Sequence, residues 1–330
     1  MNILILLPEN DVCWQFLPRE NIEHLNALGT VHYNEKGRQF TNAELKALLP
    51  EMDAVVSGWG SPKIGKEVLS EKHPAILAHV GGSIAPYTDE TTFEKGIRVV
   101  SANRVYAKSV AEGTLAYMLC ALRNIPYWDR EVRAGRWRDE NVNTFGLFGK
   151  KVGLTAYGTI PFFLVPLLRA FDVEILVRSG HMSDADCVAL GVKKAELDEI
   201  FATCDVISVH NALTEKTKGL IDARLLSTIK DDAVLINTAR GAVIDEAAMI
   251  KELAKRRFTA LLDVFEQEPL PLDSALFKMD NVILVPHMAG PTGDLRPASG
   301  RAVIDDIARL TRGEPLENEI KGDAAKNMTI

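Results

Sequence analysis

Three polar residues follow apolar runs in the second half of the chain: Arg240 in "VLINTARGAVIDE", Glu268 in "LLDVFEQEPL" and His287 in "NVILVPHMAGPT". Open α/β sheets bind ligands at the carboxyl ends of their strands, which is where these residues would lie. A planar guanidinium holds oxyanions through paired hydrogen bonds, and a histidine exchanges protons near neutral pH. A carboxylate beside a histidine fixes its tautomer and stabilises the protonated ring. The three types together favour acid/base chemistry on an anionic small molecule, although each alone also fits a structural role, as a strand-end histidine, a turn or a solvated loop.

Composition narrows the classes of partner. The 330 residues predict two domains, and the net charge of −7 with interspersed basic residues argues against nucleic acid. No apolar run reaches the roughly 18 residues of a membrane span, so no membrane partner is expected. The four cysteines are scattered without zinc spacing, which predicts no metal site and a reducing, cytoplasmic location; they are Cys13, Cys120, Cys187 and Cys204.

Short apolar runs alternate with longer amphipathic stretches, which predicts an α/β fold with parallel sheets. The expected strands are "NILILL", "AVVSG", "AILAHVGG", "RVVSAN", "KVGLTAYG", "VEILVRS", "DVISVH", "AVLINTA", "TALLDVF" and "VILVPH". Helical spacing predicts a long buried helix over 110–123 after a polar turn, and another within 293–314 that ends near Gly313. The last ten residues, 321–330, are expected to be a loosely held tail.

The stretch "VGLTAYGTIP" resembles a Gly-x-Gly-x-x-Gly phosphate loop in which Ala156 and Pro161 replace the first and third glycines. Gly158 keeps the position where backbone approaches a pyrophosphate most closely. Proline in the first helical turn removes no intrahelical hydrogen bond, whereas Pro166 is expected to kink or shorten the helix. The loop alone leaves open whether it binds a nucleotide or is an ordinary strand-turn-helix connection.

After the next strand, Arg178 and Ser179 stand where a cofactor without a 2′-phosphate would need an acidic residue. A guanidinium and a hydroxyl suit a 2′-phosphate better than a diol, so the cofactor preference leans toward NADP. The alternative is a solvated arginine at a strand end.

Taken in order, several segments resemble the D-isomer-specific 2-hydroxyacid dehydrogenase family. They are "ILAHVGGSI", "VSAN....SVAEGTLAYML", "LFGKKVG", "CDVISVHNALTEKTKGLI", "LINTARGAVIDE", "LLDVFEQEP" and "VPHMAGPT". The resemblance implies two Rossmann-like domains with parallel sheets and a hinge between them. A discontinuous, flavodoxin-like substrate domain would comprise residues 1–101 and 292–330, and the dinucleotide-binding domain, 102–291, would be inserted into it.

The resemblance also implies the roles of individual residues. Arg240 would clamp a small 2-oxo acid, His287 and Glu268 would form the acid/base dyad, and the backbone of Val80, Gly81 and Gly82 would hold the substrate carboxylate. Trp59 is a further candidate for the substrate pocket, although an aromatic residue in a turn between domains is as often part of the packing. The NAD(P) cofactor would lie against Tyr157, Gly158, Thr159, Ile160, Arg178, Ser179, His210, Thr217, Thr238, Ala239, Asp263, His287 and Gly290. His210 could equally be structural.

The implied activity is reversible hydride transfer between NAD(P)H and a small 2-oxo acid. The alternatives are a non-catalytic nucleotide-sensing or partner-binding relative, and a formate- or phosphite-type dehydrogenase, which Glu268 disfavours. The chain departs from the family pattern on the adenine and pyrophosphate side, at Ala156, Pro161, Ser179 and Ala212, and keeps the hydride-end residues. A homodimer is also implied, with Leu115, Tyr117, Met118 and Leu122 as expected contacts.

Overall fold

The structure is a computed structural model that describes residues 1–139 and 142–329. The chain divides into two compact units, and each is described by itself. Unit 1 comprises Met1–Ala107 and Pro291–Ile330, and unit 2 comprises Lys108–Gly290. Within the described ranges, no helix combines the length and hydrophobicity that a membrane span requires.

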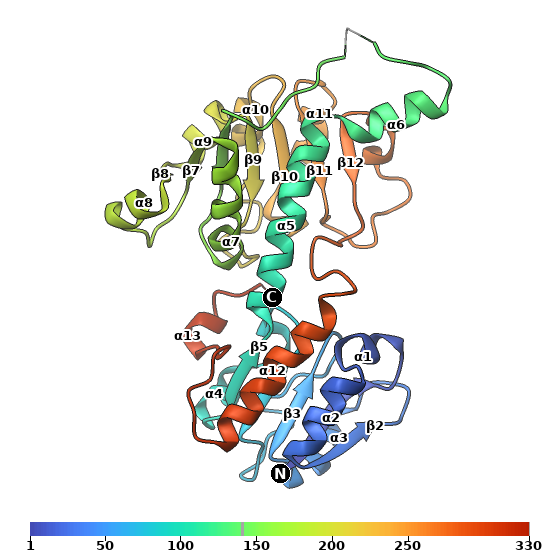
Figure 1. The fold of residues 1–330 in the computed structure, drawn as a ribbon, viewed down its shortest axis with the longest axis vertical. Helices are drawn as coiled ribbons and strands as arrows, with labels where there is room; N and C mark the ends of the chain where they lie inside the picture. The colour runs from blue at the N-terminus through green and yellow to red at the C-terminus, as the bar shows by residue number, and fades with distance from the viewer. Residues whose placement is uncertain (140–141, 330) are drawn as a thin grey trace. The chain divides into compact units, whose positions relative to one another are not determined.

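Unit 1 contains a five-stranded parallel sheet in the order β2-β1-β3-β4-β5, of which β2, β3 and β5 are labelled in Figure 1. One face of the sheet is covered by the helices α1 (Asp11–Phe16), α2 (Arg19–Leu28) and α12 (Arg296–Thr311), which contribute Phe16, Leu25 and Ile304 to the core. The other face is covered by α3 (Asn42–Leu48) and the C-terminal segment. The strands are β1 (Asn2–Pro8), β2 (Thr30–Asn34), β3 (Ala54–Ser57), β4 (Ile76–His79) and β5 (Arg98–Ser101). The helices are α1 (Asp11–Phe16), α2 (Arg19–Leu28), α3 (Asn42–Leu48), α4 (Glu90–Glu94), α12 (Arg296–Thr311) and α13 (Gly322–Ala325), with 3-10 turns at Leu49–Glu51 and Ala85–Tyr87.

Unit 2 contains a seven-stranded parallel sheet in the order β12-β11-β10-β9-β6-β7-β8. Its strands are β6 (Lys151–Leu154), β7 (Glu174–Val177), β8 (Lys193–Lys194), β9 (Val206–Val209), β10 (Val234–Asn237), β11 (Thr259–Leu262) and β12 (Val282–Leu284). Its helices are α6 (Ile125–Arg133), α7 (Thr159–Leu168), α8 (Asp184–Leu190), α9 (Leu197–Thr203), α10 (Ala223–Thr228) and α11 (Glu246–Leu253), with 3-10 turns at Arg169–Phe171, Gly241–Val243 and Ala275–Lys278. The boundary between the units falls within α5 (Asn103–Leu122).

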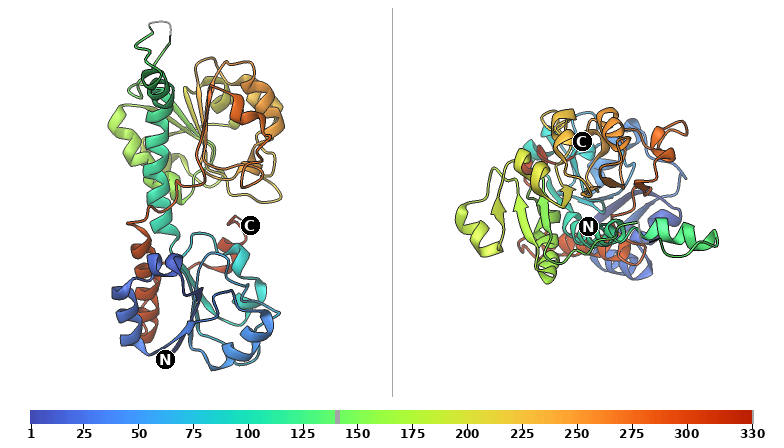
Figure 2. Two further views of the ribbon diagram at one scale, coloured as in Figure 1. Left: turned by 90° about the vertical axis from the view of Figure 1, so that its right-hand side faces the viewer. Right: turned by 90° about the horizontal axis from the view of Figure 1, so that it is seen from above.

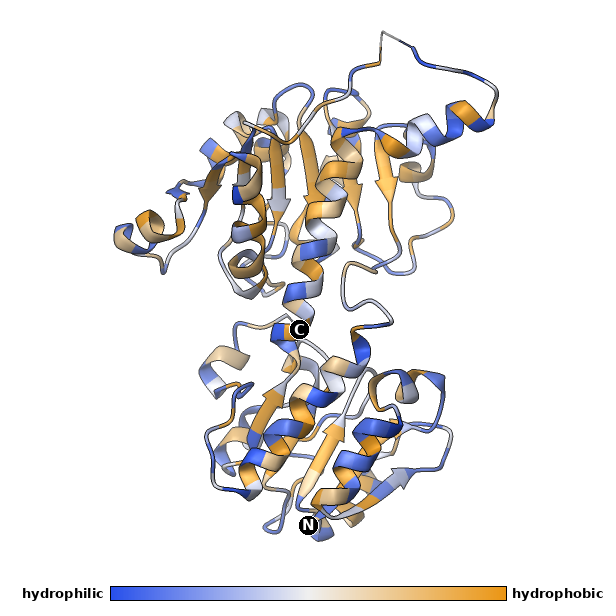
Figure 3. Cartoon of the chain, viewed as in Figure 1, coloured by the Kyte–Doolittle hydropathy of each residue, from blue (hydrophilic) through white to orange (hydrophobic). Residues whose placement is uncertain are grey.

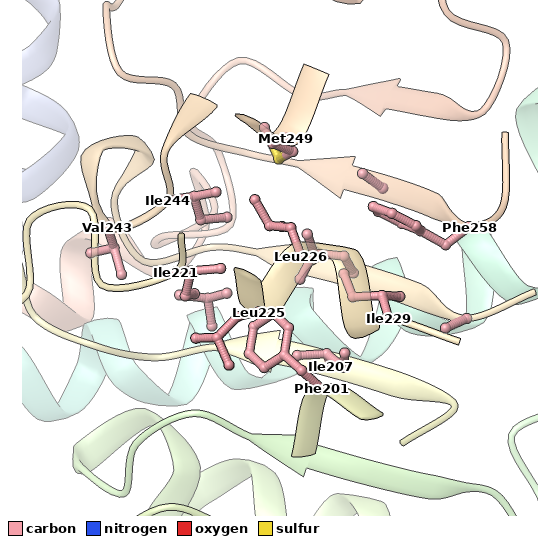
Figure 4. Close-up of a cluster of buried hydrophobic side chains, with 14 of the residues drawn as sticks. Phe201, Ile207, Ile221, Leu225, Leu226, Ile229, Val243, Ile244, Met249 and Phe258 are labelled. Carbon is pink, nitrogen blue, oxygen red and sulfur yellow. The ribbon is translucent and has the colours of Figure 1, made fainter. Parts of the chain in front are cut away.

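Helices cover both faces of the unit 2 sheet, so its central strands are buried on both sides (Figure 2). Ile207 faces a core that also contains side chains of α9, α10 and α11 (Figure 4), and Leu235 belongs to the same core. Val206 and Val234 face a second core with α5 and α7. Strands of this kind are apolar at nearly every position, as the colouring of β10 and β11 shows (Figure 3). All ten predicted strand runs contain a strand, and the α/β prediction is confirmed.

The helix predicted over 110–123 begins earlier than expected. It starts at Asn103, directly after β5, so the predicted polar turn is the first part of α5. Two of the residues expected at a dimer interface, Met118 and Leu122, are buried in the core of unit 2 itself. That part of the prediction is wrong, because their side chains pack on the subunit's own sheet.

The C-terminal tail is also held more firmly than predicted. Ala325 of α13 is buried in the core of unit 1, and Met328 packs against the same cluster. The Ser83 hydroxyl donates to the carbonyl of Thr329 at 2.6 Å, and the Ile320 N–H donates to the Val99 carbonyl. Residue 330 lies outside the described residues.

The prolines of α7 are accommodated differently. Pro161 is the third residue of the helix and is buried, and its missing N–H is one that the first helical turn would leave unpaired in any case. Pro166 lies inside the helix, which changes to a 3-10 turn after Leu168.

Candidate active site

His287 and Glu268 form a hydrogen-bonded pair at the carboxyl edge of the unit 2 sheet. The imidazole Nδ1 lies 2.7 Å from Glu268 Oε2, and the other carboxylate oxygen accepts the N–H of Phe265 at 3.1 Å. An ionised carboxylate only accepts hydrogen bonds, so Nδ1 carries the hydrogen and Nε2 is the ring atom that can exchange a proton. The two side chains are 47% and 36% exposed, which leaves the pair accessible to a substrate.

The backbone that presents His287 is held by Asp263. His287 has φ of +50°, a left-handed conformation that non-glycine residues seldom adopt. Its N–H donates to the Asp263 carbonyl at 2.8 Å, and the buried Asp263 carboxylate accepts the N–H groups of Met288 at 2.8 Å and Ala289 at 3.0 Å. The Tyr117 hydroxyl donates to the same carboxylate at 3.3 Å. Asp263 therefore has a positioning role for the histidine.

Arg240 follows β10 in a turn that Asn237 fixes. The Asn237 side chain accepts the Ala239 N–H at 3.0 Å and donates to the Arg240 carbonyl at 3.1 Å. The Arg240 guanidinium donates to the Ala239 carbonyl at 2.6 Å. Burial lowers the pKa of Arg240, and the negative charge of Glu268 acts in the opposite direction. The guanidinium is thus within electrostatic range of the dyad.

A glycine next to Arg240 allows the β10 and β11 loops to touch. A Cβ on Gly241 would lie 1.9 Å from the Phe265 carbonyl carbon and 2.3 Å from the Glu266 nitrogen. No side chain fits there without a backbone shift, so this approach depends on glycine. It brings the turn that carries Arg240 against the segment that carries Glu268.

The predicted phosphate loop lies at the switch point of the unit 2 sheet, where β6 pairs with both β7 and β9. Gly158 immediately precedes α7, and a Cβ there would meet no atom within 4 Å. Open space before a helix N-terminus at a switch point fits a dinucleotide phosphate. Pro161 contributes no N–H, so Thr159 and Ile160 are the first-turn residues before it that carry amides. Tyr157 and Ile160 also pack against the core that contains α5 and α7.

Some of the predicted cofactor-binding residues after β7 and β9 already form hydrogen bonds within their own loops. The Ser179 hydroxyl accepts the N–H groups of His181 and Met182, each at 3.2 Å, whereas the Arg178 side chain is 48% exposed and 3.9 Å from Glu196. The Thr217 hydroxyl donates to the Ala212 carbonyl at 2.6 Å and closes the loop there. Arg178 is therefore the more available of the two predicted 2′-phosphate contacts.

Thr155, which the sequence analysis missed, links β6 to the end of β9. Its hydroxyl donates to the Asn211 side chain at 2.6 Å and accepts the His210 N–H at 3.1 Å. The sequence signal that could have found Thr155 was its place directly after an apolar strand.

Three further predicted cofactor-binding residues lie on the β10 side of the sheet or after it. The Thr238 hydroxyl lies 3.1 Å from that of Thr114. Ala239 is buried, and Gly290 is the last residue of unit 2.

His210 is buried, and neither ring nitrogen has a hydrogen-bond partner within residues 1–139 and 142–329. Burial lowers its pKa to about 3. The ring is therefore neutral at physiological pH, unlike a group that exchanges protons there.

The Val80–Gly82 segment follows β4 in unit 1. The Val80 N–H donates to the Ser57 carbonyl at 2.9 Å, so it is not available to a ligand, which corrects the prediction for that residue. In the part of the chain that the structure describes, the N–H groups of Gly81 and Gly82 have no partner. Ser101 fixes the segment through hydrogen bonds to the carbonyls of both glycines.

Comparison with known proteins identifies the family to which this chain belongs. The family model "D-isomer specific 2-hydroxyacid dehydrogenase, NAD binding domain" matches residues 115–289, more than half of the chain. The chain belongs to the D-isomer-specific 2-hydroxyacid dehydrogenase family. The matched range lies inside unit 2 and contains Arg240, Glu268 and His287.

Individual relatives agree with this assignment. The hydroxypyruvate reductase of Thermotoga maritima is 31% identical over 268 residues, which cover 80% of this chain and 86% of that protein. The D-3-phosphoglycerate dehydrogenase of Archaeoglobus fulgidus is 32% identical over 279 residues, 84% of this chain and 53% of its own. This chain thus spans about half the length of that dehydrogenase. The crystal structure of the TT0316 protein of Thermus thermophilus has the same fold, with a TM-score of 0.79, 25% identity and coverage of 97% and 100%.

The burial of His210 predicts how stability changes with pH. Between about pH 6.5 and 3 the unfolded chain binds a proton at this histidine and the folded chain does not, so folding is destabilised as the pH falls below 6.5. His210→Gln removes this contribution of up to about 1.4 kcal/mol per pH unit. The loss of unfolding free energy from pH 7 to pH 5, measured by urea denaturation, should therefore be smaller in the variant.

A matched control is His181→Gln, since His181 is exposed and folding does not desolvate its ring. It should retain the pH dependence of the wild type. An unchanged pH dependence in His210→Gln would contradict the assignment of a buried neutral ring.

Proposed function

We propose that the protein catalyses the reversible reduction of a small 2-oxo acid to its D-2-hydroxy acid with NAD(P)H. The observation that carries this proposal is the 2.7 Å hydrogen bond between His287 Nδ1 and Glu268, which leaves Nε2 as the proton-exchanging atom. Family membership and relatives named as hydroxypyruvate reductase and D-3-phosphoglycerate dehydrogenase support it.

The three polar residues have complementary roles in this proposal. The guanidinium of Arg240 polarises the substrate carbonyl and holds the adjacent carboxylate through paired hydrogen bonds. His287 gives its Nε2 proton to the carbonyl oxygen in reduction and takes one from the hydroxyl in oxidation. Glu268 stabilises the protonated ring and fixes its orientation. A reduced nicotinamide, when bound, supplies the hydride.

The backbone of Gly81 and Gly82 is proposed to hold the substrate carboxylate. Their N–H groups are unpaired within the described residues, and the Ser101 hydroxyl holds both carbonyls on the same segment. A Cβ on Gly81 would lie 2.3 Å from His79 Nε2, so glycine at this position lets the segment pack on that ring.

Removal of the proton donor tests the reaction itself. His287→Ala should lower kcat/KM for 2-oxo acid reduction by about 100-fold to 10000-fold, the usual contribution of general acid–base catalysis, with little change in NADH affinity. Glu268→Gln should lower kcat less and change its pH profile, because the ring keeps a hydrogen-bond partner without a charge. The measurement is steady-state turnover with NADH and NADPH across a panel of 2-oxo acids.

Glu266→Gln is a matched control on the same loop, since Glu266 is exposed. Equal activity of His287→Ala and the wild type would reject the dyad. Cofactor binding with no turnover of any 2-oxo acid would favour a non-catalytic, nucleotide-sensing or partner-binding protein. Turnover of formate or phosphite in place of 2-oxo acids would favour a formate- or phosphite-type dehydrogenase.

The cofactor is proposed to be NADP rather than NAD. The half-exposed Arg178 guanidinium follows β7, and its contact with Glu196 is long, at 3.9 Å, so it can turn to a 2′-phosphate. Arg178→Ala should weaken NADPH binding about 10-fold or more and NADH binding much less. Glu196→Gln should strengthen NADPH binding, because it frees the guanidinium. Calorimetric titration measures both, and an equal loss for the two cofactors in Arg178→Ala would reject the assignment.

A homodimer is proposed through α6 and the residues after it. Ile125 and Val132 are each 53% exposed and Trp137 is 80% exposed, an unusual density of exposed apolar side chains. Trp137→Asp combined with Val132→Glu should shift the protein from dimer to monomer in sedimentation velocity. Val188→Glu, an equally exposed change on α8, should not. A monomeric wild type would reject the dimer.

The protein is proposed to act in the cytoplasm. All four cysteines are free thiols, as expected in a reducing compartment. Cell fractionation tests this, and recovery of the protein in an extracellular or membrane fraction would contradict it.

A further inference from the structure

The unit 1 sheet has a switch point of its own. β1 pairs with both β2 and β3, in the order β2-β1-β3-β4-β5, which is the flavodoxin-like order. In such sheets, ligands bind at the carboxyl ends of the two strands that flank the reversal. Here α1, with Gln15 and Phe16, follows β1, and Trp59 follows β3.

An aromatic cluster with a cation occupies this edge. The Trp59 ring meets the rings of Phe16 and Tyr106 edge-on, at centroid distances of 5.0 Å and 6.2 Å. The Arg296 guanidinium carbon lies 5.4 Å from the Trp59 centroid and 5.8 Å from that of Phe16. Trp59 is 43% exposed although it packs on the buried ring of Phe16. The cluster therefore presents one open aromatic side chain beside a positive charge.

The charge of Arg296 is not neutralised by the chain. One guanidinium nitrogen donates to the side chain of Gln15, and within the described residues no Asp or Glu lies within ion-pair distance. The Arg296 Nε and the Tyr106 hydroxyl are both buried and have no hydrogen-bond partner there. Burial raises the pKa of Tyr106 and the charge of Arg296 lowers it, so the two groups act on each other.

The same cluster adjoins the predicted carboxylate-binding segment. A Cβ placed on Gly82 would lie 3.4 Å from the Tyr106 ring, an ordinary contact distance. A substrate whose carboxylate sits on the Gly81 and Gly82 amides would therefore lie beside Tyr106, and its other end could contact that ring. That end is the side chain of the 2-oxo acid.

We propose that Trp59, Tyr106 and Arg296 form the subsite that selects the substrate side chain, and that it prefers a side chain with a second anionic group. The inference rests on the proposed reduction of 2-oxo acids and narrows its substrate class. The shared chemistry is an oxyanion, from either a carboxylate or a phosphate.

The two donors without partners, the Arg296 Nε and the Tyr106 hydroxyl, distinguish between the kinds of substrate side chain that the subsite could bind. Buried polar groups without partners are costly, and an oxyanion can accept from both the guanidinium and the tyrosine hydroxyl. An aliphatic side chain would leave both groups unpaired. An aromatic side chain would stack on Trp59 but would also leave them unpaired. An anion also compensates the charge of Arg296.

The test compares four 2-oxo acids that differ in side chain: 2-oxobutanoate, 2-oxobutanedioate, 3-phosphonooxy-2-oxopropanoate and phenylpyruvate. The wild type should favour one or both acidic substrates by at least 30-fold in kcat/KM, and the preferred one identifies carboxylate or phosphate. Arg296→Met should remove that preference through KM, with less than a 3-fold change for 2-oxobutanoate. Arg296→Lys should restore part of it, and Tyr106→Phe should lower it about 5-fold. Arg301→Met is the matched control, an exposed arginine of the same helix that pairs with Asp305.

Preference for 2-oxobutanoate or phenylpyruvate, or an equal loss for all substrates in Arg296→Met, would overturn the subsite and leave the proposed reaction intact. If Arg296→Met does not fold, the lysine and Tyr106→Phe variants decide. If the wild type reduces no 2-oxo acid, the proposed function fails, and calorimetry with D-malate and D-2-hydroxybutanoate tests the subsite alone. Tighter binding of D-malate that Arg296→Lys weakens supports it, and equal binding overturns it.

Discussion

The arrangement of the candidate site depends on one buried carboxylate. Asp263 directly follows β11 and accepts hydrogen bonds from two successive backbone N–H groups and from a tyrosine hydroxyl, while its own carbonyl accepts the N–H of His287. Hydrogen bonds to a charged acceptor contribute about 1.5–3 kcal/mol each, enough to offset the cost of a left-handed histidine. The position of the imidazole depends on the backbone of His287, and Asp263 fixes that backbone. Asp263 therefore determines how close the ring lies to Glu268.

The second constraint is backbone contact at Gly241. It packs the turn of Arg240 on the chain between Asp263 and Glu268, so Arg240 and the His287–Glu268 pair share one rigid support. Asn237 adds two hydrogen bonds to the same turn. Three strand ends of one sheet thus act as a single element, and catalytic geometry of this kind tolerates little displacement.

The sequence predicted the fold well where strands are buried on both faces, because a short, continuous apolar run between turn residues is typical of such a strand. It missed β2 and β8, which lie at sheet edges; β8 is the exposed pair Lys193–Lys194. It also placed the start of α5 too late, since polar residues such as Asn103 and Lys108 in its first turns resemble a loop. Ala325 and Met328 are held by contacts with parts of unit 1 that are distant in the sequence. The local sequence pattern around these residues does not predict such contacts.

Arg240, Glu268 and His287 were found by one rule, that polar groups follow apolar strands at the carboxyl edge of a sheet. Three histidines lie at or just after the ends of strands, His79, His210 and His287, and position along the sequence alone cannot rank them. Their surroundings do: burial lowers the pKa values of His79 and His210 to about 3, whereas His287 is half-exposed and hydrogen-bonded to a carboxylate. Of these three rings, only that of His287 is both open to a ligand and hydrogen-bonded to a carboxylate. The chemistry therefore depends on exposure and on a partner 19 residues away, two properties that arise only when the chain has folded.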